Sequence, residues 1–119
     1  MRGKGARGTS EGIDVLDGVQ AFAIGFAPSL PTLRARSSSL GDQMEHALIS
    51  VPLNLAEGAY SRGKNRQARF QTAAASAREV QACWETAQAL GWCAPMDPAL
   101  SALFNRVIGT LVRLTKSRF

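Results

Sequence analysis

The stretch that decides the fold is KNRQARFQTAAASAREVQACWETAQAL, residues 64–90. Phe70, Ala77 and Trp84 recur every seven residues along it, which is the period of helices that pack at a shallow angle. Three smaller apolar positions interleave with them: Ala73, Val80 and Ala87. Residues 72–77 are nearly all small, so a second backbone can approach closely. The stretch therefore predicts one long helix inside a helical bundle.

Three more segments show helical period, and none of the chain shows good strand alternation. We expect helices over residues 13–27, from one of Ser37, Ser38 or Ser39 to Tyr60, and over residues 98–116. Their inward positions are predicted to be Ile13, Leu16, Val19, Ala23 and Phe26 or Ala27; Leu40, Met44, Leu48, Val51 and Leu55; and Leu100, Leu103 or Phe104, Val107, Leu111 and Leu114. The prediction is an all-α, antiparallel up-and-down four-helix bundle over residues 11–119, preceded by a flexible basic arm over residues 1–10.

Capping residues and prolines set the expected ends of these helices. Thr9 or Ser10 is a candidate cap for the first helix, residues 28–38 read as a connector, and Asp97 caps the last helix. Gly91 supplies the stop after residue 90. Pro52 lies within the second helix, where it removes one backbone hydrogen bond and crowds the carbonyl of the preceding turn. We predict a bend there, with a break into two short helices as the alternative.

Composition excludes several classes of protein. The 119 residues carry a formal net charge of +5 and 45% hydrophobic residues, which suits one globular domain. Cys83, Cys93 and His46 are too few to predict a metal site or a disulfide framework, so we expect no metal and no cofactor. No apolar run approaches the roughly 20 residues that a membrane span needs, and a reducing cytoplasm is the expected compartment.

Two patterns imitate catalytic sites. Gly58-Ala59-Tyr60-Ser61-Arg62-Gly63-Lys64-Asn65 nearly matches the phosphate loop G-x-x-x-x-G-K-[ST], but Asn65 lacks the hydroxyl and helix precedes it in place of a strand. Asp42, His46 and Ser50 are spaced four apart, as on one helical face, yet nothing marks an oxyanion hole. We therefore predict no catalytic residue and a protein that is not an enzyme.

Basic residues gather at the turn between the second and third helices and at the end of the chain. No acid occurs between Gly58 and Arg78, while free backbone N–H groups at the start of the third helix add to the positive field. The candidate nucleic-acid-binding residues are Arg62, Lys64, Arg66, Arg69, Arg113, Lys116 and Arg118. A solvated basic turn is the alternative.

Polar residues flank the core positions of the second and third helices. Those singled out as a structural polar network are Gln43, Ser50, Asn54, Glu57, Ser76 and Glu79. A partly buried carboxylate needs a partner, and Arg62, Arg66, Arg69 and Arg78 are near in sequence. The residues form either a network that fixes helix register and subunit pairing, or two ordinary solvated faces.

Residues 40–92 resemble the four-helix-bundle proteins of the bacterial 23S rRNA intervening-sequence family. The resemblance rests on Leu40, Gln43, Ser50, Pro52, Asn54, Ala56, Glu57, Gly58, Arg62, Phe70, Ala73, Ser76 and Glu79. One departure is Glu45-His46, where the family usually has basic residues.

The resemblance implies an antiparallel four-helix bundle and a ring-like homopentamer, with no established catalytic role for the polar signature. Distant relatives that accompany retroelement reverse transcriptases are basic pentamers that bind nucleic acid and a protein partner. The function expected for this chain is a non-enzymatic oligomer that binds RNA or another nucleic acid through a basic surface. The alternative is a self-assembling scaffold for a protein partner, with no direct nucleic-acid role.

Overall fold

The computed structural model describes the backbone of residues 7–116 and the side chains of residues 16–116. The described chain is all-α and contains no strand, as the sequence predicts. Its elements are α1 (Arg7–Phe26), a 3₁₀ turn η1 (Ala27–Ser29), α2 (Leu30–Arg36), α3 (Ser38–Ala59), α4 (Gly63–Ala89) and α5 (Pro98–Thr115). None of the helices in this range is both long and apolar enough to cross a lipid bilayer.

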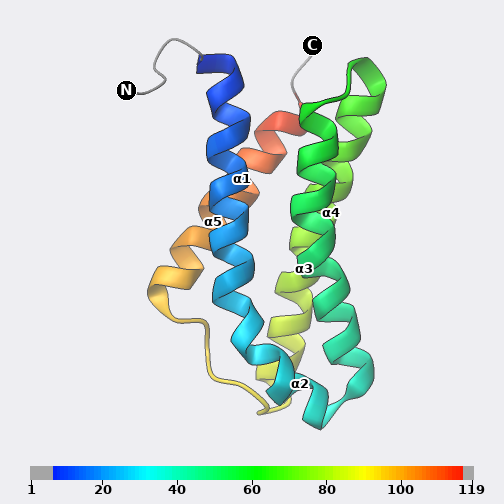
Figure 1. Ribbon diagram of the computed structural model, residues 1–119. Coiled ribbons are helices and arrows are strands. Elements are labelled where there is room, and N and C mark those ends of the chain that lie inside the picture. Colours follow the sequence, from blue (N-terminus) through cyan, green and yellow to red (C-terminus); the bar gives the residue numbers. More distant parts are fainter. Residues whose placement is uncertain (1–6, 117–119) are drawn as a thin grey trace.

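The four long helices lie side by side (Figure 1). α3 packs against α4, α4 against α5, and α1 against both α3 and α5, so the contacts close around one core. Figure 1 also shows the start of α1, the end of α5 and the turn between α3 and α4 at the same end of the molecule. That end therefore brings together segments that are far apart in the sequence.

Within the described side chains, the core side of α1 includes Phe22, which the predicted stripe lacks, while the predicted Ile13 lies outside them. Val19, Phe22 and Phe26 are fully buried, whereas Ala23 is only half-buried. The Phe22 ring lies 4.8 Å from that of Phe26 and 5.4 Å from that of Phe104, so it links α1 to α5. α1 also begins at Arg7, which places Thr9 and Ser10 inside the helix and not at its start.

The predicted connector over residues 28–38 is mostly helical, and here the sequence interpretation was wrong. Pro28 and Pro31 lie in the first turns of η1 and α2, where a missing N–H leaves no helical hydrogen bond unmade. α2 packs onto the start of α3. A Cβ at Gly41 would lie 2.9 Å from the Arg34 Cα, so glycine permits this close approach.

α3 starts and continues largely as expected. The Ser37 side chain accepts a hydrogen bond from the Leu40 N–H and caps the helix. The helix is continuous through Pro52, so the alternative of two separate short helices is wrong, while a bend at Pro52 stays a prediction. The predicted core positions Met44, Leu48, Val51 and Leu55 are all buried.

The ends of α4 and α5 follow their capping chemistry. Gly91 adopts a φ of 78°, and the N–H groups of Gly91 and Trp92 bond to the carbonyls of Gln88 and Ala87, which closes α4 with a Schellman motif. The Asp97 carboxylate accepts a hydrogen bond from the Ala99 N–H at the start of α5. Along α4 the seven-residue series is buried or half-buried from Phe70 to Ala87.

Candidate nucleic-acid interface and polar network

A chain of hydrogen bonds joins α3 to α4 on one side of the core. The Ser50 and Ser76 hydroxyls lie 2.7 Å apart, and Ser76 is only 7% exposed. The Asn54 amide donates to the Ser50 hydroxyl and to the Ser50 carbonyl, each at 3.0 Å. Each buried hydroxyl therefore has a partner, which removes the cost of desolvating it.

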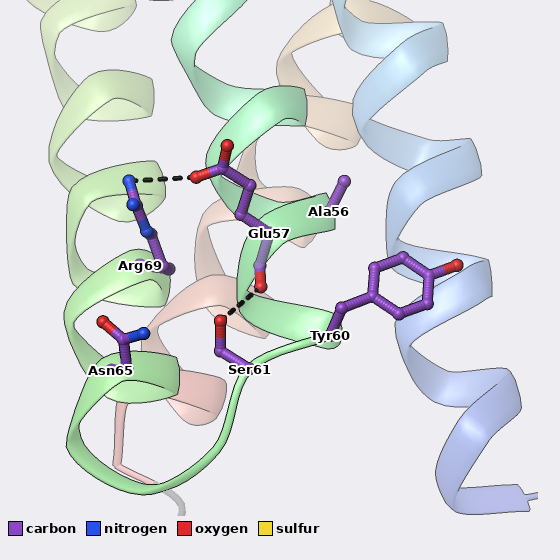
Figure 2. A pocket seen from close by; sticks show the side chains of 6 residues that line it. All are labelled: Ala56, Glu57, Tyr60, Ser61, Asn65 and Arg69. Atoms are coloured by element: carbon purple, nitrogen blue, oxygen red, sulfur yellow. Dashed lines mark hydrogen bonds and ion pairs between the residues drawn. The ribbon is translucent and has the colours of Figure 1, made fainter.

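The chain continues outward to an ion pair at the protein surface. Arg69 donates to the Asn54 side-chain oxygen at 3.3 Å and lies 3.0 Å from a carboxylate oxygen of Glu57. Figure 2 shows Glu57 of α3 and Arg69 of α4 pointing toward one another across a surface pocket of about 360 Å³. In the same view Tyr60 points away from this pair. Arg69 thus serves as the surface end of the α3–α4 network.

Four of the six residues predicted for this network are brought together: Ser50, Asn54, Glu57 and Ser76. The other two, Gln43 and Glu79, are exposed, and among the described side chains neither has a hydrogen bond or ion pair. Glu79 has a different effect. Burial raises the pKa of the Cys83 thiol, and the negative charge of Glu79 raises that pKa further. Cys83 is therefore a protonated, buried thiol at neutral pH.

Two of the four basic residues at the α3–α4 turn are held by the fold. The Arg66 guanidinium donates to the Ser61 carbonyl at 3.1 Å and to the Ala59 carbonyl at 3.4 Å. The Ala59 carbonyl ends α3 and the Ser61 carbonyl lies in the turn just after it, a place where a cation is favoured by the helix dipole. Arg66 and Arg69 therefore stabilise the α3–α4 hairpin, and their charges already interact with carbonyl and carboxylate groups of the protein itself.

Arg62 and Lys64 are different, because both side chains are exposed and neither has an ion pair or side-chain hydrogen bond within residues 16–116. Arg62 is the residue before α4, and Gly63 beside it takes a left-handed φ of 59°. Glycine adopts this conformation at little energetic cost, which allows the chain to turn tightly between α3 and α4. Arg62 and Lys64 lie exposed on either side of Gly63.

The cations at the end of α5 lie at the same end of the molecule as this turn (Figure 1). Arg113 and Lys116 are exposed, and Arg113 donates to the Thr110 hydroxyl at 3.1 Å. Arg118 lies outside the described residues. Asp17, near the middle of α1, is also exposed.

The structure shows where the residues of the two patterns that resemble catalytic sites lie. Gly58 lies within α3 and Lys64 within α4, so the near-match to a phosphate loop is the junction of two helices with no strand before it. Of the proposed triad, Asp42 accepts from Arg34, Ser50 bonds to Ser76, and His46 is exposed. Within the described residues no cluster of His, Cys, Asp or Glu could hold a metal ion.

A family model described as 23S rRNA-intervening sequence protein matches residues 29–111. The chain belongs to this family. The match spans α2, α3, α4 and most of α5, and it includes every residue of the network between α3 and α4. A search of curated proteins and a search of solved structures gave no match. The family's polar signature therefore has a structural use in this member, since it ties α3 to α4.

The structure also shows a surface that the sequence prediction missed. Outside the core stripe, α3 and the residue that follows it present a row of apolar side chains to solvent, which we call the outer α3 face: Ile49, Pro52, Leu53, Ala56 and Tyr60. The signal was present, because Ile49 and Leu53 are large aliphatic residues four apart that fit neither the core stripe nor the polar stripe. An apolar row of this kind is a second candidate binding surface, separate from the basic turn.

Proposed function

We propose that this member of the 23S rRNA-intervening sequence protein family is a non-enzymatic homo-oligomer that binds RNA through its basic end. The observation that carries the proposal is a pair of exposed cations, Arg62 and Lys64, at the start of α4, which have no ion pair among the described side chains. Phosphates are attracted both by these charges and by the free N–H groups of the first helical turn. Arg113 and Lys116 extend the same positive field.

Two further observations and one inference support this proposal. The family description refers to 23S rRNA. The net charge of +5 favours a polyanionic partner. We also infer that successive long helices run antiparallel, up and down, because only residues 60–62 separate α3 from α4. In this arrangement α5 ends beside the basic turn between α3 and α4.

Self-association would strengthen a site that is weak in one copy. Arg62 and Lys64 give modest affinity in a single copy, but several copies on one assembly bind the same RNA with a high effective concentration. The family resemblance implies a ring of five, and we propose a homo-oligomer acting in the cytoplasm. The number of subunits follows from the mass in solution, measured by light scattering.

The proposal is tested by reversing the free charges. The double variant R62E/K64E should lose retention on RNA at moderate salt, because two attractions become repulsions in each copy. The matched control is R36E/R78E, which changes the net charge equally but at exposed sites on α2 and in the second half of α4. Equal retention by both double variants would mean that binding follows net charge alone, and unchanged retention by R62E/K64E would refute the proposal.

A scaffold for a protein partner is the second candidate function, and the outer α3 face favours it. Leu53 of α3 is 58% exposed and Tyr60, the residue after α3, is 90% exposed, although the core side of the helix is packed against α1 and α4. Apolar groups gathered on a surface are typical of contact sites. The scaffold hypothesis predicts that one protein copurifies at a fixed ratio after nuclease and high salt, and that R62E/K64E leaves this ratio unchanged. Recovery of nucleic acid alone would contradict it.

A further inference from the structure

An exposed aromatic ring lies beside the basic turn. Tyr60 directly follows α3, two residues before Arg62 and four before Lys64. At 90% it is the most exposed large apolar side chain among the described residues. Figure 2 shows its ring extending outward from the end of α3. A flat aromatic ring gains free energy by stacking on another flat ring, so Tyr60 can serve as a platform for a nucleobase.

The backbone that carries Tyr60 is held in place on both sides. The Tyr60 N–H donates to the Glu57 carbonyl at 3.2 Å. The Arg66 guanidinium donates to the carbonyls of Ala59 and Ser61, the residues on either side of Tyr60, at 3.4 Å and 3.1 Å. The side chain can turn, but its attachment point is fixed relative to the neighbouring cations. Such preorganisation lowers the conformational entropy that is lost on binding.

The surface pocket of about 360 Å³ adjoins this platform (Figure 2). Tyr60 contributes to its lining together with Asn65 of α4, whose side chain is exposed and has no hydrogen-bond partner among the described residues. A free amide can both donate to and accept from the edge of a base. Glu57, which also lines the pocket, is paired with Arg69, so it repels RNA less than a free acid would. The pocket therefore offers room and hydrogen-bonding groups next to the ring.

Bases can reach such a site only when they are unpaired. In an RNA duplex the bases stack on one another, and the deep, narrow major groove hides their edges. In loops and single strands they are free to stack on aromatic side chains, a contact that is typical of proteins that bind single-stranded nucleic acid. A duplex therefore offers its phosphates to Arg62 and Lys64 but no base to Tyr60.

We propose that unpaired RNA bases stack on Tyr60 while the phosphates beside them lie on Arg62 and Lys64. The proposal rests on the RNA binding in the proposed function and deepens it, because it names single-stranded RNA as the substrate class. The two cations supply an attraction that any polyanion shares, and Tyr60 supplies the preference for unpaired bases. All three residues come from one copy, so self-association multiplies the site without changing it.

The first experiment measures, by fluorescence anisotropy, binding to a labelled RNA of about 12 nucleotides, either single-stranded or annealed to its complement. Tyr60→Ala should weaken binding to the single strand about 5- to 150-fold for each base that stacks, and should leave binding to the duplex unchanged. Tyr60→Phe keeps the ring and should bind both RNAs like the wild type. The control is Leu53→Ala, which removes another exposed apolar side chain of the outer α3 face and should change neither affinity.

The second experiment separates stacking from charge through the salt dependence of binding to the single strand. Stacking releases no counterions from the RNA, so Tyr60→Ala should lower the binding constant at every salt concentration. The slope of its logarithm against the logarithm of salt concentration should stay the same. Removing Arg62 and Lys64 should reduce that slope instead. A reduced slope for Tyr60→Ala would mean that the ring acts by placing the cations, and would overturn the stacking role.

The outcomes separate this inference from the proposed function. If R62E/K64E loses RNA but Tyr60→Ala binds the single strand like the wild type, the stacking site is wrong and the RNA-binding proposal stands. Equal losses by Tyr60→Ala on the single strand and the duplex also overturn the stacking site, because a duplex has no unpaired base. If the wild type binds neither RNA, or if neither R62E/K64E nor Tyr60→Ala changes binding, both proposals fail.

Discussion

The two sides of α3 differ in how their side chains are satisfied. Toward α4, the hydroxyls of Ser50 and Ser76 bond to one another, and Gly58 leaves room for the Phe70 ring. Toward solvent, Leu53 and Tyr60 have little covering them. The side of α3 that faces α4 is packed and hydrogen-bonded like a protein interior. The side that faces solvent leaves large apolar side chains exposed, as a binding surface does. One helix can therefore fix the fold on one side and remain available for assembly on the other.

The largest expected effect is on the side facing α4, at Gly58. A Cβ at this position would lie 2.5 Å from Phe70 Cε1 and 2.7 Å from Cδ1, so the buried ring must shift. Gly58→Ala should therefore lower the free energy of unfolding by about 1–3 kcal/mol. Gly18→Ala is the control, since its Cβ would meet Val107 at an ordinary 3.8 Å; it should gain about 0.5–1 kcal/mol. Equal urea midpoints for the two variants would contradict this close approach.

A smaller effect is expected in the hydrogen-bonded chain. Ser50→Ala removes a hydroxyl that bonds both Ser76 and Asn54, and it leaves the Ser76 hydroxyl buried without that partner. The expected loss is about 0.5–1.5 kcal/mol, since Ser50 is only half-buried, with Ser76→Ala costing less because Ser50 keeps Asn54. The double variant should cost less than the two losses added together. Strict additivity in denaturant unfolding would show that the two hydroxyls do not interact.

The smallest effect is expected at the ion pair of Glu57 and Arg69, where the hydrogen-bond network between α3 and α4 reaches solvent. The Glu57 and Arg69 side chains are each about half-exposed, so water and salt screen their attraction. Glu57→Gln should change the free energy of unfolding by less than about 1 kcal/mol at low salt. Thermal unfolding at low and high salt measures this difference, which should vanish at high salt. A larger loss, or one that persists in salt, would mean that the pair belongs to the interior.

Local chemistry made much of the fold predictable. Ser37, Asp97 and Gly91 mark helix ends because each satisfies backbone groups within a few residues. The seven-residue series of α4 marks its buried side for a similar reason, since periodicity reports which side of a helix is apolar. The 23S rRNA-intervening sequence family was also recognisable from the α3–α4 signature, and the family match confirms it.

Contacts between distant residues were harder to predict. Ser50 and Ser76 are 26 residues apart, so only the packing of α3 on α4 decides that they meet. Arg66 was expected to face a phosphate, yet it bonds to carbonyls at the end of α3, because the tight turn places those groups beside it. Pro28 and Pro31 were read as breakers although each is tolerated in the first turn of a helix.

The most direct test of the functional account is the salt dependence of binding to single-stranded RNA. For the wild type, the logarithm of the binding constant should fall linearly with the logarithm of salt concentration, because each neutralised phosphate releases counterions. Replacing Arg62 and Lys64 together by Ala should reduce the slope by about 1.4 for each bound subunit, at about 0.7 for each phosphate that is no longer neutralised. An unchanged slope would contradict the claim that these two cations bind the RNA backbone.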